Sequence, residues 1–210
     1  MGILRTLAGL AFLVSIAALA WQARRALSQG PPRVEAPPRG RARDGVAYAF
    51  GRGMSPWAKE SARLHPAVYV AGVLYHVGIF TSIGVVGLVV AGAPWLDRVS
   101  VVVAPLLALS AVAGIGLLAR RVATPGIRTV SSPDDYASNL AATLLIVAAL
   151  VSMASDGPAP SLLVVATLVF LYAPLGKIRH CVFFFLARAG FGRLLGRRGV
   201  LPGVAHGARP

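Results

Sequence analysis

Five long apolar runs constrain the fold of this 210-residue chain more than any other feature. A helix needs about 20 mostly apolar residues to cross the hydrocarbon core of a bilayer, and these runs have that length or come near it. They are Leu4–Trp21, Ala67–Ala91, Val99–Ala119, Asn139–Ala154 and Ser161–Ala187. The fourth run is short but can extend backward through Tyr136. We therefore expect an all-α membrane protein, a bundle of five transmembrane helices.

The composition agrees with a membrane protein. Only 13% of the residues are charged and 56% are hydrophobic, whereas soluble domains carry about twice that charged fraction. The single cysteine, Cys181, excludes an internal disulfide framework and a thiolate-held cluster, and we interpret it as an inert core residue. The net charge of +14 could suit nucleic acid, but the arginines flank apolar runs and do not line a soluble face. We expect no nucleic-acid partner.

The distribution of Lys and Arg predicts the orientation. Nine of them lie in residues 22–66, three in 120–138 and seven in 177–210, so 19 of 21 fall on one side of a five-span chain. The positive-inside rule then places the N-terminus outside and the C-terminus in the cytoplasm, in a multi-pass protein of a bacterial inner membrane. The first run could also be a signal peptide, but Arg24 and Arg25 directly after it favour a retained span.

This topology divides the chain into four parts. Residues 1–22 form the first span, 23–66 a cytoplasmic Arg/Pro-rich loop, 67–188 a four-helix transmembrane core, and 189–210 a basic cytoplasmic tail. Within the loop, residues 30–45 are rich in Pro, Gly and Arg, and we expect them to be irregular. SPWAKESARL (55–64) predicts a short helix on the inner membrane surface, with Ser55 as its cap and Pro56 at its first position.

Two histidines lie inside apolar runs: His76, within LYHVGIF, and His180. An unpaired polar side chain in apolar surroundings costs roughly 1–3 kcal/mol, so it usually faces a partner, a cavity or a cofactor. Measured from Ala67 and Ala187, the two imidazoles lie at depths of about 13 Å and 10 Å if both helices are continuous. Similar depths suit two axial ligands that face one another across a metalloporphyrin.

Three glycines support this hypothesis. Gly72 and Gly176 each precede a histidine by four residues, and Gly87 follows His76 by 11, so each would share a helix face with an imidazole. A flat macrocycle needs a face without side chains, and these glycines are therefore candidates for a haem pocket. Glycine is common in membrane helices in any case, which weakens the signal.

Haem suits these residues better than a bare metal ion. Two histidines leave zinc or copper short of ligands, and no carboxylate lies at matching depth. Asp134 and Asp135 are interpreted as a helix cap before Tyr136. Haem supplies four nitrogens itself, so two histidines complete its coordination, and filled axial positions favour electron transfer over oxygen chemistry. Basic residues near the inner membrane edge are candidate contacts for the haem propionates: Arg120, Arg121, Arg128, Lys177 and Arg179. Interfacial snorkelling would explain Lys177 and Arg179 equally well.

Three stretches resemble a known family. They are LYHVGIF (74–80), LLARRVATPGIRTVSSPDDY (117–136) and APLGKIRH (173–180). The last has a proline six residues before the histidine, a small residue four before it and a basic residue three before it. From about residue 60 to 190 the chain resembles the gamma subunit of respiratory nitrate reductases and its relatives, including the membrane cytochromes of sulfite- and heterodisulfide-reductase-linked complexes. These are five-span membrane b-type cytochromes.

The resemblance implies that His76 and His180 ligate a haem b on the inner side. The better-known members hold a second, outer haem, whose ligand positions read Val86 and Leu162 in this chain. We therefore expect one haem, and the quinol site that belongs beside the outer haem is put in doubt. His65, 11 residues before His76, is a further candidate for a second ligand or a quinone contact.

Three functions remain open. The first is an electron-transfer subunit, not catalytic alone, that links menaquinone or ubiquinone to a cytoplasmic iron–sulfur or reductase partner. The second is a haem-free membrane scaffold of the same fold that anchors a soluble redox complex. The third is a small transporter. The spans lack paired acidic residues and carry only Pro105 well inside a middle span, which disfavours the transporter.

Overall fold

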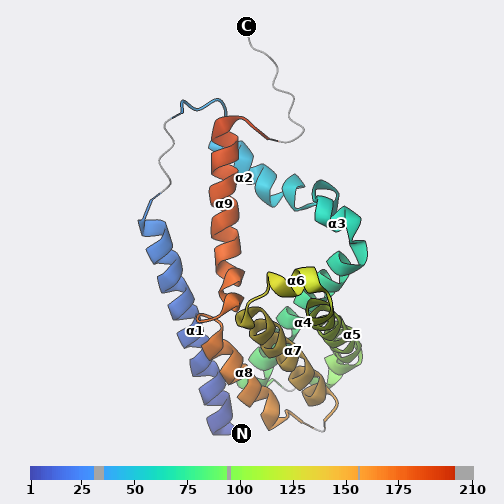
Figure 1. Ribbon diagram of the computed structural model, residues 1–210. Coiled ribbons are helices and arrows are strands. Elements are labelled where there is room, and N and C mark those ends of the chain that lie inside the picture. Colours follow the sequence, from blue (N-terminus) through green and yellow to red (C-terminus); the bar gives the residue numbers. More distant parts are fainter. Residues whose placement is uncertain (31–35, 94–95, 156, 202–210) are drawn as a thin grey trace. The chain divides into compact units, whose positions relative to one another are not determined.

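The computed structural model describes residues 1–30, 36–93, 96–155 and 157–201, and within these ranges every regular element is a helix (Figure 1). The long helices are α1 (Gly2–Ser28), α4 (Pro66–Ala91), α5 (Leu96–Ala123), α7 (Pro133–Met153), α8 (Pro160–Tyr172) and α9 (His180–Arg198). The short elements are α2 (Ala42–Phe50), α3 (Glu60–Leu64), α6 (Pro125–Thr129) and the 3₁₀ turns η1 (Arg52–Met54), η2 (Pro56–Ala58) and η3 (Lys177–Arg179).

Four helices are long and apolar enough to cross a membrane. They are α1, α4, α7 and the Ser100–Ala123 part of α5. A fifth span is present if α8 and the helix that follows its break count as one broken span. The expectation of an all-α protein with membrane-spanning helices is therefore confirmed, and the expected five spans are matched by four helices, or by five if the broken pair counts as one span. The fourth run also extends backward as expected, because α7 begins at Pro133.

The fifth apolar run was expected to form one continuous helix, and this expectation was wrong. Helix α8 ends at Tyr172, a turn follows, and α9 begins at His180. Pro174 explains the break, because proline has no N–H to donate and its ring clashes with the preceding turn of a helix. Within the turn, the backbone N–H groups of Leu175 and Gly176 both donate to the Tyr172 carbonyl, at 2.9 and 3.0 Å.

The chain divides into two units. The bundle unit comprises Met1–Ala18 and Pro66–Arg179. The basic unit comprises the described residues of 19–65 and 180–210. Helix α1 contributes to both units, and the boundary near the C-terminal end falls between η3 and α9, which follow each other directly in the chain.

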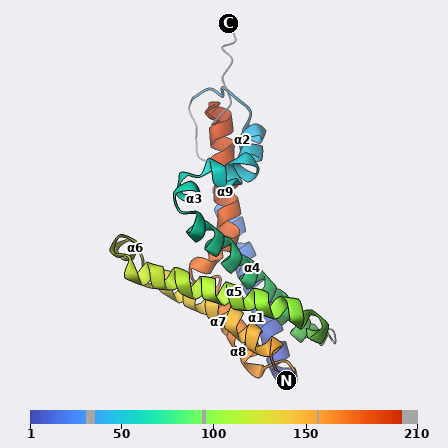
Figure 2. The same ribbon diagram turned by 90° about the vertical axis from the view of Figure 1, so that its right-hand side faces the viewer.

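Small residues bring the helices of the bundle unit together, and α5 and α7 run side by side in it (Figure 2). A Cβ atom on Gly78 of α4 would collide with the Ser110 side chain of α5. At this crossing the Ser110 hydroxyl donates to the Leu74 carbonyl at 3.0 Å. Small residues and hydroxyl bonds of this kind replace the hydrophobic effect as the cause of helix association in lipid.

Tyr75 joins α4 to α7 within the buried core. Its hydroxyl donates to the Asn139 carbonyl at 2.7 Å and lies 2.9 Å from the Thr143 hydroxyl. Gly114 of α5 leaves room for the Tyr75 ring, since a Cβ there would collide with it. The rest of the core is apolar and includes Val85, Leu107, Leu145, Ile146 and Leu163.

In the basic unit, α2 and α9 approach each other closely through their backbones. A Cβ on Gly192 would lie 2.7 Å from the Gly45 carbonyl oxygen, and one on Gly196 would lie 2.5 Å from the Arg41 carbonyl oxygen. Arg188 of α9 completes the contact, because its Nε and Nη2 donate to the carbonyls of Ala49 and Gly53 at 2.5 and 2.6 Å. Both carbonyls lie at or beyond the C-terminal end of α2, where helix carbonyls lack intrahelical donors.

This contact corrects one expectation. The loop was expected to be irregular through residue 45, yet α2 begins at Ala42. The described part of the segment assigned as a basic tail, from residue 189, is helical to Arg198. The expected helix over 55–64 is divided into η2 and α3, although the Ser55 hydroxyl does accept the Trp57 N–H at 3.3 Å and Pro56 does take the first helical position.

Candidate functional site

His76 lies in the middle of α4, and its side chain is exposed on the surface of the bundle unit. Its Nδ1 lies 2.7 Å from the carbonyl oxygen of Gly72, one helical turn earlier. When Nδ1 carries the proton, it donates to this carbonyl and Nε2 becomes the nitrogen that can bind a metal. Histidines that bind metals usually hold their other ring nitrogen in this way. His76 therefore fits the role of an axial ligand.

The face of α4 around His76 is unobstructed at two glycines. No heavy atom lies within 4 Å of the position that a Cβ would take on Gly72 or on Gly87. Residues four before and 11 after His76 share its helix face. The clearance expected from the sequence is therefore present on this helix.

His180 has a different setting. It is the first residue of α9, belongs to the basic unit and is exposed. Helix α9 is continuous from His180 past Ala187, so the break before it does not change the distance along the helix between these two residues. Gly176 lies in the turn and not on a helix with His180, and a Cβ on it would collide with the Tyr172 ring. The two histidines belong to different units, and their pairing stays a prediction.

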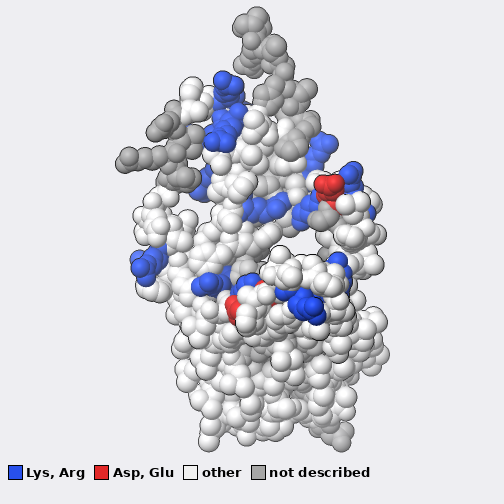
Figure 3. Space-filling view, viewed as in Figure 1, with Lys and Arg blue, Asp and Glu red and all other residues white. Residues whose placement is uncertain are grey.

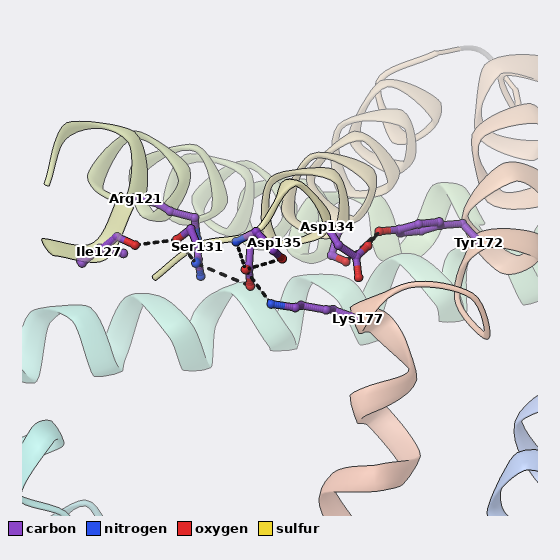
Figure 4. A network of polar contacts seen from close by, with 9 residues as sticks. Arg121, Ile127, Ser131, Asp134, Asp135, Tyr172 and Lys177 are labelled. Carbon is purple, nitrogen blue, oxygen red and sulfur yellow. Dashed lines mark hydrogen bonds and ion pairs between the residues drawn. The ribbon is translucent and has the colours of Figure 1, made fainter. Parts of the chain in front are cut away.

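A polar network lies where α5, α7 and η3 meet in the bundle unit (Figure 4). The Lys177 ammonium lies 2.6 Å from Asp135 Oδ2, and Arg121 Nη1 lies 3.6 Å from Asp135 Oδ1. Arg121 also donates to the Ser131 hydroxyl at 2.8 Å, and that hydroxyl donates to the Ile127 carbonyl at 2.7 Å. Two of the candidate propionate contacts, Lys177 and Arg121, therefore have a carboxylate of the protein as their neighbour.

The two aspartates have separate structural roles. Asp135 accepts the backbone N–H and the hydroxyl of Ser132 at 2.8 and 3.0 Å, which confirms its interpretation as a cap of α7. Asp134 accepts a hydrogen bond from the Tyr172 hydroxyl, which also lies 3.0 Å from the Ser138 hydroxyl. The network ties the C-terminal end of α8 to the N-terminal turn of α7.

The other candidate residues fall into two groups. Four basic side chains are exposed: His65, Arg120, Arg128 and Arg179. Val86 and Leu162, at the positions where the resemblance would place the ligands of a second haem, are 3% and 0% exposed in the apolar core. Cys181 is exposed at the start of α9, so its interpretation as a core residue was wrong. The break before α9 explains this, because it ends the apolar helix to which Cys181 was assigned.

Among the residues that the structure describes, no three His, Cys, Asp or Glu side chains come together in a group that could hold a metal ion. A porphyrin needs only one or two axial ligands from the protein. His76, with its Nδ1 bond and open flank, has the geometry of one such ligand.

Comparison with known proteins found no relative: no family model, no curated protein and no solved structure matches this chain. The function therefore has to be inferred from the residues themselves.

Proposed function

We propose that this protein is a membrane-anchor b-type cytochrome subunit. It would hold one haem b between His76 and His180 and pass electrons between a membrane quinone and an iron–sulfur or reductase partner on the cytoplasmic side. The observation that carries the proposal is the bond between His76 Nδ1 and the Gly72 carbonyl, within an otherwise apolar helix. Haem bound there would supply reversible one-electron chemistry.

The residues of α4 would orient the ligand. The Gly72 carbonyl selects the tautomer of His76 and limits the rotation of its ring, so that Nε2 is presented to a metal. The missing side chains at Gly72 and Gly87 would leave room for the edge of a flat ring.

Absorption spectroscopy of the purified protein tests the proposal. The reduced-minus-oxidised spectrum should show a b-type haem, and His76→Ala and His180→Ala should each abolish haem retention. His65→Ala is the matched control and should keep its haem. A wild-type protein without a b-type spectrum would refute the function, and unchanged haem content in either variant would refute that ligand.

The proposed orientation has the N-terminus outside and the C-terminus in the cytoplasm. It is supported by the 19 of 21 Lys and Arg residues that fall in the segments assigned to the inner side. A C-terminal fusion to green fluorescent protein should fluoresce, and a C-terminal alkaline phosphatase fusion should be inactive. The opposite pair of results would reverse the topology and place the partner on the other side.

Electron transfer by this chain would require a partner. With a single cysteine, it cannot ligate an iron–sulfur cluster of its own. The exposed arginines of the inner loops would favour encounter with an acidic partner surface. Cross-linking in native membranes, followed by identification of the attached chains, would name this partner.

A haem-free membrane scaffold is the second candidate function. It is favoured by the pairing of Lys177 with Asp135 and by the Tyr172 ring that covers Gly176, because both features have a structural role without a cofactor. A colourless protein that still co-purifies with a soluble redox complex would support this alternative over the cytochrome.

A further inference from the structure

The turn between α8 and α9 is tied to α7 at both of its ends (Figure 4). The hydroxyl of Tyr172, the last residue of α8, donates to the Asp134 carboxylate and lies 3.0 Å from the Ser138 hydroxyl. Lys177, the first residue of η3, places its ammonium 2.6 Å from Asp135 Oδ2. Asp134 and Asp135 are consecutive residues in the first turn of α7, so one short stretch of α7 holds the chain before and after the turn.

The interior of the turn is closed. Pro174 and Gly176 are buried, and a Cβ on Gly176 would collide with the Tyr172 ring. The Gly176 N–H donates to the Tyr172 carbonyl at 3.0 Å. Ile178, the residue after Lys177, packs against the apolar core of the bundle unit. The turn is therefore a packed part of the bundle unit and not a loose connection.

The two ties lie at the charged edge of the bundle unit. On the face shown in Figure 3, the charged side chains of this unit gather near α6 and the start of α7, and its remaining surface is uncharged. Asp134 and Asp135 are both partly buried at this edge. A partly buried carboxylate without a donor costs free energy, which favours the closed state of both ties.

His180 follows the tied turn directly. Arg179 is the last residue of η3 and of the bundle unit, and its peptide bond leads to His180, the first residue of α9. Consecutive Cα atoms lie about 3.8 Å apart, so the His180 Cα stays within about 11 Å of the Lys177 Cα for any direction of α9. A metal ligand has to be held within about 0.5 Å of its productive position. A shift of Lys177 away from α7 would therefore be passed on to His180.

We propose that Tyr172 and Lys177, held by Asp134 and Asp135, are positioning residues for the His180 ligand. The inference rests on the proposed function, and none of the four residues would touch the iron. They act through the backbone of the turn, by keeping His180 where it can bind the haem. This role differs from contact with a propionate, because Tyr172 and Asp134 share it and neither is a cation.

Carbon monoxide binding to the reduced, haem-loaded protein tests this role. Carbon monoxide binds ferrous haem at an open axial position, so its binding rate reports how often a histidine leaves the iron. Tyr172→Phe keeps the ring over Gly176 but removes the hydroxyl that bonds Asp134, and the rate should rise about fivefold. Tyr136→Phe, which removes a hydroxyl from the same end of α7, is the matched control and should leave the rate unchanged.

The lysine tie is tested by charge. Lys177→Met removes the ion pair with Asp135 and should raise the rate of carbon monoxide binding, whereas Lys177→Arg can still pair with Asp135 and should keep the rate of the wild type. Ser152→Ala is a control for stability alone. It removes the hydroxyl that accepts the Ala159 N–H at the other end of α7, so it should lower thermal stability without raising the rate.

The glycine of the turn provides an independent test. Gly176→Ala would drive a Cβ into the Tyr172 ring, so the turn has to open and the rate should rise at least as much as in Tyr172→Phe. Gly157→Ala adds the same group where no heavy atom lies within 4 Å and should leave the rate unchanged. The Tyr172 and Lys177 variants decide the question if Gly176→Ala does not fold.

Failure of this inference is distinguishable from failure of the proposed function. A haem-loaded protein whose carbon monoxide binding is unaffected by Tyr172→Phe and Lys177→Met would overturn the positioning role alone. An equal rise in Ser152→Ala and Tyr172→Phe would also overturn it, since general loosening would then explain both. A wild type without haem, or one whose haem binds carbon monoxide immediately, would overturn the pairing of His76 with His180 and this inference with it.

Discussion

The Lys177 ammonium lies 2.6 Å from Asp135 Oδ2 and so joins the residues that follow α8 to the first turn of α7. Asp135 also accepts two hydrogen bonds from Ser132. Asp135→Asn removes the charge that Lys177 and Arg121 share, so we expect a loss of about 1 kcal/mol in the free energy of unfolding. Thermal unfolding in detergent measures this loss.

A double-mutant cycle separates the ion pair from the cap. Lys177→Met combined with Asp135→Asn should show a coupling of about 0.2–1 kcal/mol, because the Lys177 side chain is half exposed and water screens the pair. Strictly additive losses would show that the pair contributes nothing and that Asp135 acts through Ser132 alone.

The tyrosine between α4 and α7 provides a second prediction. Tyr75→Phe removes the hydroxyl that bonds Asn139 and Thr143, and interhelical bonds of this kind contribute about 0.6 kcal/mol on average. We expect a decrease in thermal stability of that order. Tyr69→Phe, six residues earlier on the same helix, is the control and should change stability less. Equal effects of the two variants would contradict the assigned role of Tyr75.

The contact between α2 and α9 provides a third prediction. Gly192→Leu would place a side chain against the Gly45 carbonyl and the Val46 Cα, so the two helices should separate. Hydrogen exchange of the α2 amides should become faster, consistent with an overpacking cost of about 1–3 kcal/mol. Gly190→Leu adds the same side chain two residues away, where the space is open, and should leave exchange in α2 unchanged. Slow exchange in Gly192→Leu would show that the close approach is not required.

The open flank of His76 provides a fourth prediction, which depends on the proposed haem. Gly72→Leu should leave the protein folded, because no heavy atom lies near the new Cβ, but it should reduce haem content by placing a side chain beside the imidazole. Gly78→Leu should instead destabilise the fold through collision with Ser110. Haem absorbance per folded protein measures the difference, and full haem content in Gly72→Leu would exclude the macrocycle from that flank.

Local sequence signals predicted the spans and one cap well. Apolar length alone identified the four candidate spans α1, α4, α5 and α7, because a helix in lipid must satisfy its own backbone. The Ser132–Asp135 cap was also readable, since its partners are three residues apart and need no distant contact. The prediction of a continuous fifth helix was wrong because average hydropathy takes no account of Pro174. Its missing N–H interrupts the hydrogen bonds of the helix backbone.

Helix α2 could not be predicted from its local composition. Its residues follow a segment rich in Pro, Gly and Arg, and they form a helix that packs on α9 from the other end of the chain. The one available signal was the spacing of Gly192 and Gly196, four apart, which is typical of helices whose backbones approach closely. The pairing of Lys177 with Asp135 was equally inaccessible, because it joins residues 42 positions apart.

The contact between Arg188 and Ala49 has a consequence for biosynthesis. The two residues are 139 positions apart, and the candidate spans α4, α5 and α7 lie between them. During translation, α2 leaves the ribosome long before α9 is made, so the carbonyls at the C-terminal end of α2 have no Arg188 donor until then. Assembly of this part of the protein therefore follows the synthesis of α4, α5 and α7, and a chain truncated before Arg188 would contain these spans while leaving α2 without the Arg188 contact.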